Sequence, residues 1–227
     1  MQAGSLHHKT TSFILLKSSF NRGSAMNASF PLTRRTFLVG VTAVPACLAL
    51  TGCGADAPVS NSFQALMAVN EVAAQAACKS YCAAQDAYRR TDYNKDGVLE
   101  YAQALSGNNS LYETKAGLGD IAMIDRSFAH AEGSIGKATP KAGYCFKILT
   151  RQGANAPGGA KSFIENGHMT LGYALVAFPA QYGESGRKTY IVSHAGLVYE
   201  KDMGAATPSI IEKMSEYNPD ATWLPAE

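Results

Sequence analysis

The chain has 227 residues, of which 46% are hydrophobic and 17% are charged, as in an ordinary globular protein. This composition excludes a disordered tail, a collagen-like fibre and a protein with many membrane spans. The first 52 residues hold five Lys and Arg and no acidic residue, and the remainder holds 15 basic and 18 acidic residues, so the overall charge of +2 becomes −3 beyond them. The body of the chain lacks the basic excess that nucleic-acid binding requires, and we expect no nucleic-acid partner.

Residues 1–52 are predicted to be an export signal. Arg34 and Arg35 are followed by Thr-Phe-Leu and by a short apolar stretch that ends in small residues. This pattern resembles the twin-arginine signal, which directs folded proteins out of the cytoplasm, and we expect Arg34 and Arg35 to be its recognised pair. An ordinary secretory signal that carries Arg-Arg by chance is the alternative. Met26 is a second candidate start, which would leave residues 1–25 outside the protein.

The end of this leader predicts a lipid anchor. Leu50-Thr51-Gly52-Cys53 resembles a bacterial lipobox, in which cleavage leaves the cysteine as the first residue with its thiol joined to lipid. More than one acyl chain gives stable anchoring, whereas a single chain is marginal. A plain cleavage site with a chance cysteine is the alternative. We expect an exported, periplasmic lipoprotein held to a bacterial membrane through Cys53, with residues 53–61 as a tether.

Residues 62–227 are predicted to form one α+β domain that opens with a long helix. Apolar side chains recur at helical spacing over residues 62–90, which predicts an amphipathic helix. Its apolar face is expected to contain Phe63, Leu66, Met67, Ala73, Ala74, Ala77, Tyr81, Ala84 and Tyr88. Residues 91–117 are rich in turn signals and are expected to be a loop, followed by a short helix over 118–131 and a second loop.

The second half of the domain has the character of an antiparallel sheet. Runs of β-branched and aromatic residues predict strands, and these runs are residues 144–150, 171–178, 188–193 and 197–200. A last short helix is expected near 207–215. Helices first and strands afterwards predict a long N-terminal helix packed on an antiparallel β-meander.

The loop after the long helix carries the sharpest chemical pattern. Oxygen-bearing side chains alternate at Asp92, Asn94 and Asp96 before a glycine, which resembles the first half of an EF-hand calcium loop. Calcium takes six to eight oxygen ligands, and the Val98 carbonyl and the Glu100 carboxylate would extend the set. The usual bidentate glutamate is replaced by glutamine, so we expect weak calcium binding. A solvated turn without metal is the alternative.

Three further cysteines, Cys78, Cys82 and Cys145, lie beyond the anchor. An oxidising compartment permits disulfides, but three thiols cannot all pair within one chain. Cys78 and Cys82 share a helix face, and a bridge between them or from the helix to a strand stays open at this point. Cys145 lies in an apolar strand and is expected to be a buried core residue.

A long helix on an antiparallel sheet resembles the type IV pilin and pseudopilin layout. The stretch Ala83-Ala84-Gln85-Asp86-Ala87-Tyr88, then a polar loop and Tyr101-Ala102, is similar to the end of a pilin helix. Pilins continue an apolar membrane segment into that helix, whereas here a lipoprotein leader stands in its place. We therefore do not expect polymerisation through a shared helical core.

Short ordered segments carry a closer resemblance. They are Asn70-Glu71, Gln85-Asp86-Ala87-Tyr88, Asp96-Gly97-Val98-Leu99-Glu100-Tyr101-Ala102, Leu111-Tyr112, Ile148-Leu149-Thr150, Gln152-Gly153, Ala156-Pro157-Gly158-Gly159-Ala160, Asn166-Gly167-His168-Met169, Ala174-Leu175-Val176-Ala177, Pro179-Ala180, Tyr182-Gly183, Ile191-Val192, Val198-Tyr199-Glu200-Lys201-Asp202 and Pro219-Asp220-Ala221-Thr222-Trp223. Over about residues 66–225 the chain resembles an uncharacterised exported bacterial family, domain of unknown function 2950. The resemblance implies a fold and a location, and it implies no mechanism.

No residue set with the spacing of a known catalytic motif is evident in the sequence. We therefore expect a non-enzymatic binding or scaffolding role at the cell envelope, with an envelope protein or a glycan as partner. An envelope enzyme of unrecognised mechanism is the alternative.

Overall fold

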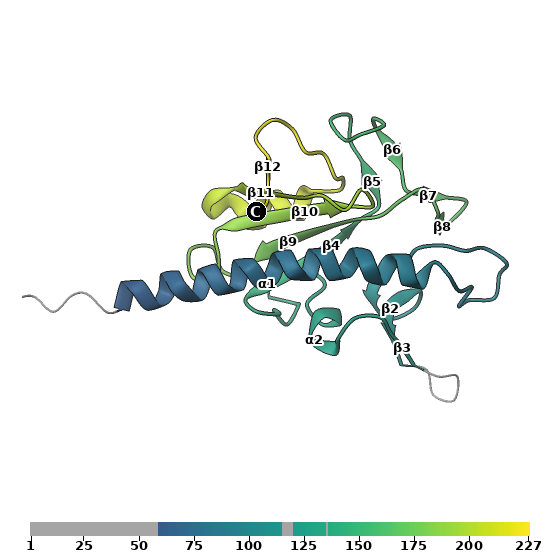
Figure 1. Cartoon of the computed structure of the whole chain (residues 1–227), viewed down its shortest axis with the longest axis horizontal. Helices are drawn as coiled ribbons and strands as arrows, with labels where there is room; N and C mark the ends of the chain where they lie inside the picture. Colours follow the sequence, from purple (N-terminus) through teal and green to yellow (C-terminus); the bar gives the residue numbers. More distant parts are fainter. Residues whose placement is uncertain (1–58, 115–119, 135) are drawn as a thin grey trace, which may run out of the picture. The chain divides into compact units, whose positions relative to one another are not determined.

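A long helix lies against an antiparallel sheet in the computed structural model, which describes residues 59–114, 120–134 and 136–227 (Figure 1). Helix α1 (Val59–Tyr88) contacts the neighbouring strands β9, β10 and β11. The α+β class and the antiparallel sheet that the sequence predicts are confirmed. Within the described ranges, no helix combines the length and the apolar character needed to cross a bilayer.

The sheet has five strands in the order β12-β11-β10-β9-β4, and each neighbouring pair is antiparallel. Its members are β4 (Tyr144–Leu149), β9 (Ala174–Pro179), β10 (Lys188–Ser193), β11 (Val198–Asp202) and β12 (Leu224–Pro225). Strand β9 begins three residues later than predicted. At Gly172 φ is +144°, and a Cβ there would lie 2.7 Å from Nδ1 of His194, so the chain enters the strand only after this close approach.

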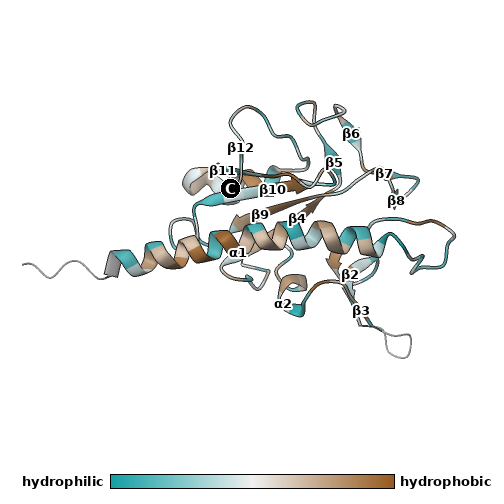
Figure 2. Ribbon diagram, in the orientation of Figure 1, coloured by the Kyte–Doolittle hydropathy of each residue, from teal (hydrophilic) through white to brown (hydrophobic). Residues whose placement is uncertain are grey.

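Both faces of the central strands are covered, which explains their continuous apolar runs. All six residues of β9 are buried, and this strand is brown in Figure 2. On β10, Tyr190 lies beside α1 side chains, whereas Ile191 lies beside the C-terminal helix α3 (Thr207–Lys213), which follows η1 (Gly204–Ala206). Tyr190 and Tyr173 are buried, so these tyrosines belong to the core.

Helix α1 packs through small and aromatic residues. Met67, Ala74, Ala77, Cys78, Tyr81, Ala84 and Tyr88 are buried. The described part of the helix already includes Val59, three residues before the predicted start, since nothing in Val59-Ser60-Asn61 breaks a helix. Phe63 and Leu66 were predicted on the buried face, but they are 55% and 52% exposed. The first turns project past the sheet in Figure 1, so periodicity alone does not bury these two side chains.

The segment after α1 differs most from the prediction. The expected loop contains β1 (Ala104–Ser106) and β2 (Ser110–Glu113), and β2 pairs with β3 (Ile121–Ala122). The helix predicted over 118–131 shrinks to α2 (Arg126–Ala129). Its N-cap is Asp125, whose Oδ1 accepts a hydrogen bond from the Phe128 amide at 3.0 Å, and an N-cap residue itself is not helical.

Two small hairpins separate β4 from β9. The first pairs β5 (Arg151–Gln152) with β6 (Lys161–Ser162), and the second pairs β7 (Ile164–Glu165) with β8 (His168–Met169). The second hairpin turns at Asn166 and Gly167, whose φ values are +52° and +86°. Positive φ at both central residues is the type I′ arrangement that Asn-Gly favours. This turn brings β8 back toward the loop that follows α1.

Candidate metal centre

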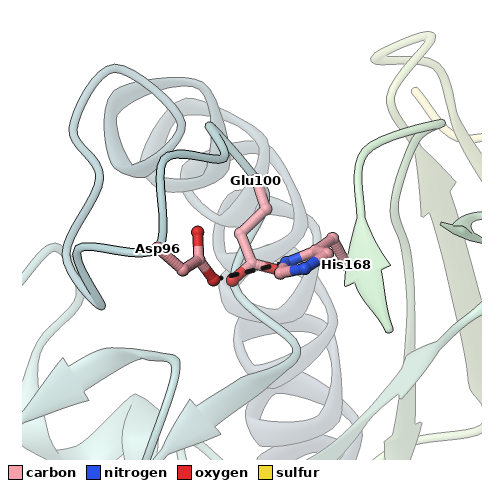
Figure 3. Close-up of side chains that lie close together, drawn as sticks. All are labelled: Asp96, Glu100 and His168. Atoms are coloured by element: carbon pink, nitrogen blue, oxygen red, sulfur yellow. Dashed lines mark ion pairs between the residues drawn. The ribbon is translucent and has the colours of Figure 1, made fainter. Parts of the chain in front are cut away.

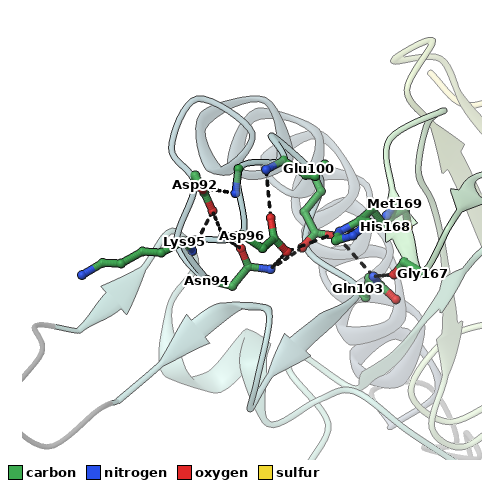
Figure 4. A network of polar contacts seen from close by, with 11 residues as sticks. Asp92, Asn94, Lys95, Asp96, Glu100, Gln103, Gly167, His168 and Met169 are labelled. Atoms are coloured by element: carbon green, nitrogen blue, oxygen red, sulfur yellow. Dashed lines mark hydrogen bonds and ion pairs between the residues drawn. The ribbon is translucent and has the colours of Figure 1, made fainter.

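The loop that follows α1 is organised around one carboxylate. The Oδ1 atom of Asp92 accepts hydrogen bonds from the amides of Lys95 at 2.7 Å and Asp96 at 3.3 Å, and Oδ2 accepts one from Gly97 at 2.8 Å. Lys95 and Gly97 have φ of +61° and +89°, conformations that the turn requires and that glycine adopts at low cost. These bonds make Asp92 the residue that holds the turn closed (Figure 4).

The same turn directs two further side chains toward one point. Asp96 Oδ1 accepts a hydrogen bond from the Val98 amide at 2.9 Å, which leaves Oδ2 directed away from the turn. Nδ2 of Asn94 donates to Asp96 Oδ2 at 2.6 Å and to Glu100 Oε1 at 3.0 Å. The Asn94 amide thus bridges two carboxylates, that of the exposed residue Asp96 and that of Glu100, which is only 5% exposed.

The β7–β8 hairpin supplies a residue that the sequence did not single out. Nδ1 of His168 lies 3.4 Å from Oε2 of Glu100 and 3.6 Å from Oδ2 of Asp96 (Figure 3). One ligand atom from each of these three residues lies within 4.8 Å of the others. Nδ1 is buried and makes no hydrogen bond, although buried polar groups normally have one, so its contacts with the two carboxylate oxygens are close approaches without hydrogen-bond geometry.

Backbone contacts hold the hairpin against the loop. The Tyr101 amide donates to the Met169 carbonyl at 2.8 Å, and the Met169 amide donates to Glu100 Oε2 at 3.3 Å. Nε2 of Gln103 donates to the Gly167 carbonyl at 2.8 Å. Gln103 stands where a calcium loop has its bidentate glutamate, and here it joins the loop to the hairpin. The site is therefore assembled from two segments more than 60 residues apart in sequence.

A buried glutamine fixes this assembly to α1. Oε1 of Gln85 accepts a hydrogen bond from the Ala102 amide at 2.8 Å, and its Nε2 donates to the Ala102 carbonyl at 2.8 Å and to the Tyr81 hydroxyl at 2.9 Å. Nearby, burial together with the carboxylates of Glu100 and Glu113 raises the pKa of Tyr88 to about 12, so its hydroxyl keeps its proton. Gln85 therefore ties the backbone at Ala102, two residues after Glu100, to α1.

The predicted ligands separate into three groups. Asp96 and Glu100 lie together with His168, and Asn94 bridges the two carboxylates. Asp92 is outside the three-residue group and uses both oxygens on backbone amides. Val98 was predicted to contribute its carbonyl, and here its amide donates a hydrogen bond to Asp96. Arg34, Arg35 and Cys53, the predicted signal and anchor residues, lie outside the described residues.

Residues 64–225 match the family described as "Protein of unknown function (DUF2950)". The chain belongs to this family. The resemblance expected from the ordered segments is thereby confirmed, and it covers the helix, the five-stranded sheet and the candidate metal centre. No curated protein and no solved structure matches the chain.

In the described part of this DUF2950 protein, the three cysteines are free thiols. Cys78 and Cys145 are buried, and Cys82 is half-buried. Burial raises the pKa of Cys82 to about 11, and burial also raises the pKa of Cys145. Since the thiolate is the reactive and metal-binding form, these groups are suited to packing, and the ligand-bearing cluster remains the one formed with His168.

Proposed function

We propose that this protein is an exported, lipid-anchored component of the bacterial cell envelope, whose α+β domain binds a divalent cation and has a binding or scaffolding role. The observation that carries the cation site is the approach of Asp96, Glu100 and His168 around a buried nitrogen that has no hydrogen bond. The proposed anchor is Cys53, and the proposed location is the periplasmic side of a bacterial membrane.

Calcium is the proposed cation, because the donors that the loop offers are mainly oxygens. Carboxylates, amide oxygens and backbone carbonyls are its preferred ligands. Rotation of the Asn94 amide would present its oxygen at the point where its nitrogen now bridges Asp96 and Glu100. The imidazole of His168 adds a ligand that zinc and other transition metals prefer, so zinc is the competing cation.

The proposed role of the cation is to join two segments of the domain. Asp96 and Glu100 belong to the loop after α1, whereas His168 belongs to the β7–β8 hairpin. A cation bound to all three residues would neutralise two adjacent carboxylates and cross-link the loop to the hairpin. A ligand that binds only the folded state stabilises it by about 2.7 kcal/mol at a concentration one hundred times its Kd, enough to order a binding surface.

Calorimetric titration of the full chain with calcium, and separately with zinc, tests this proposal. We expect saturable calcium binding at millimolar concentration together with a rise in Tm. Glu100→Gln should weaken the affinity strongly, whereas the control Glu184→Gln, at an exposed position on another loop, should leave it unchanged. His168→Ala separates the two cations, since it should remove most zinc affinity and less of the calcium affinity. Absence of heat and of a Tm shift with both cations would refute the site.

The wider arrangement supports a pilin-like layout, which we propose as the finer description of the fold. Helix α1 crosses β9, β10 and β11, and the sheet follows it in the chain. In this proposal the lipid on Cys53 takes the place of the apolar membrane segment of a pilin. Mass spectrometry of the protein purified from membranes tests the anchor, because an acylated N-terminal peptide beginning at Cys53 must be found, and Cys53→Ser must abolish it.

An envelope enzyme is the second candidate, and one cavity favours it. The cavity has a volume of about 640 Å³, and the charged residues of its lining are Glu132, Lys147 and Glu212. Burial raises the pKa of Glu132 and lowers that of Lys147, as in many active sites.

Glu132 and Lys147, the two charged groups of this cavity with shifted pKa values, already have structural partners. Oε2 of Glu132 accepts a hydrogen bond from the Leu105 amide at 2.7 Å. Nζ of Lys147 donates to the carbonyls of Ile211 at 3.1 Å and Met214 at 2.7 Å, at the C-terminal end of α3. We therefore rank binding above catalysis. Turnover of an envelope substrate that Lys147→Met abolishes while the fold survives would reverse that order.

A further inference from the structure

The first half of α1 exposes four large apolar side chains. Phe63, Leu66, Val69 and Val72 are 55%, 52%, 65% and 66% exposed, and they account for four of the nine large exposed hydrophobic side chains in the described part of the chain. We call Phe63, Leu66 and Val69, which follow one another along one side of the helix, the apolar helix face. Val72 lies further round the helix, at the groove between α1 and β10. In Figure 2 the end of α1 that projects past the sheet carries brown and tan residues along its length. A helix surface that only faces water is normally polar.

This part of α1 also lacks outward charge. Between residues 59 and 78 the only charged side chain is Glu71. Its Oε1 accepts hydrogen bonds from the amides of Arg187 at 2.9 Å and Lys188 at 3.3 Å, so the carboxylate is directed toward the loop before β10. The apolar helix face is therefore free of charge, and a partner recognised through salt bridges does not fit it.

The short distance along the chain to the proposed anchor indicates what covers the apolar helix face. Cys53 precedes Val59, the first residue of α1, by six positions. Six residues span at most about 20 Å when fully extended. If Cys53 carries lipid, the start of α1 cannot leave the neighbourhood of the membrane surface, and apolar side chains there can enter the boundary between headgroups and acyl chains, about 5–10 Å deep.

The distribution of large side chains along α1 favours a membrane over a second helix. Lys79, Asp86 and Arg90 lie on a neighbouring side of the helix, and the side that carries Leu66 and Val69 continues with the small residues Ala73, Ala76 and Ser80. A surface for pairing with a second copy would be expected to continue along the helix. Here the large apolar side chains are confined to the half of α1 nearest the anchor.

We propose that the apolar helix face packs against the surface of the membrane that holds the Cys53 lipid, so that the lipid and the helix together orient the domain on the bilayer. This inference rests on the lipid anchor of the proposed function. The helix lies on the membrane and does not cross it. The side of α1 that carries Lys79, Asp86 and Arg90 then faces away from the membrane and is accessible to an envelope partner.

Depth-dependent fluorescence quenching of the mature protein tests the proposal. An environment-sensitive fluorophore is placed at Val69→Cys, or at the control position Arg90→Cys on the exposed far end of α1, in a chain whose half-buried thiol is removed by Cys82→Ser. The protein is reconstituted into vesicles of phosphatidylethanolamine with a minority of phosphatidylglycerol and a nitroxide-bearing lipid. We expect several-fold stronger quenching and a blue-shifted emission at position 69 relative to position 90.

Each other outcome decides the question. Equal quenching at the two positions overturns the proposal. A blue shift at position 69 that grows with protein density, without lipid quenching, overturns it in favour of pairing between copies. The double variant Leu66→Asp/Val69→Asp should keep its circular dichroism spectrum and, in the Cys53→Ser background, should lose whatever vesicle flotation that background retains.

Failure of the anchor is seen separately, because the peptide that begins at Cys53 would then lack acyl mass. In that case, quenching at position 69 by added vesicles would still support affinity of the helix for the bilayer. Absence of that quenching would overturn the proposal.

Discussion

Replacement of Gln85 by leucine is the most direct test of how the candidate site is held on α1. Gln85 is fully buried and satisfies both backbone polar groups of Ala102 through two hydrogen bonds of 2.8 Å. Leucine has nearly the same volume but no polar atom. The substitution therefore removes the partners of a buried amide and a buried carbonyl without opening a large cavity.

The magnitude follows from those two groups. A buried donor or acceptor left without a partner costs about 1–3 kcal/mol. Two such groups give a loss of about 4 kcal/mol, which is large for a single substitution. For a domain of this size each kcal/mol shifts Tm by about 2–4 °C, so we expect Tm to fall by about 8–16 °C. Cation affinity should fall as well, because Ala102 lies two residues after Glu100.

Urea denaturation and thermal melts of the full chain measure the effect. Gln64→Leu is the matched control, since it makes the same change at an exposed position of the same helix and should alter stability by less than about 0.5 kcal/mol. If Gln85→Leu destabilises the domain by no more than this control does, the reasoning is refuted, and water or a shifted backbone must satisfy Ala102.

Three further predictions address other parts of the domain. Asp125→Ala should cost about 1 kcal/mol near neutral pH through the lost N-cap. Burial opposes ionisation of Asp125, but hydrogen bonds from a neighbouring serine and lysine lower its pKa to about 2. The stability advantage of the wild type is therefore present above the unfolded pKa, and it should vanish in urea titrations as the pH falls from about 4 to about 2. Burial and the neighbouring Cys82 raise the pKa of Cys78, so timed alkylation followed by mass spectrometry at about pH 8 should modify half-buried Cys82 before Cys78, and rapid modification of Cys78 would contradict its burial. Gly186→Ala would place a Cβ 2.8 Å from the Tyr144 ring and should cost about 1–3 kcal/mol in a thermal melt by overpacking; an unchanged Tm would show that the ring moves freely.

Local signals in the sequence were sufficient for the main elements. Helical periodicity predicts α1, and runs of β-branched and aromatic residues predict β4, β9, β10 and β11. They succeed because each of these elements is long enough for its own side chains to specify one period. The small sheet β1–β3 was missed, since its strands have only two to four residues and are defined by their partners.

The helix predicted over 118–131 was too long for a related reason. Its spacing of apolar residues is compatible with a helix, but Ile121 and Ala122 pair with β2. Asp125 is the N-cap of α2 and is itself not helical. A cross-strand ladder and a side-chain cap outweigh a weak local preference. The hairpin at Asn166-Gly167 was not predicted, although Asn-Gly between short strands is a hairpin signal in the sequence.

For the candidate metal centre, the sequence by itself determined the turn of residues 92–100, because the hydrogen bonds of Asp92 and Asp96 reach only two to five residues along the chain. Tertiary structure alone decided that His168 joins Asp96 and Glu100, since that contact depends on the pairing of Tyr101 with Met169 and on the β7–β8 turn. It also decided that Phe63 and Leu66 stay exposed, because a helical period fixes which side chains share a face but not where the opposing sheet ends.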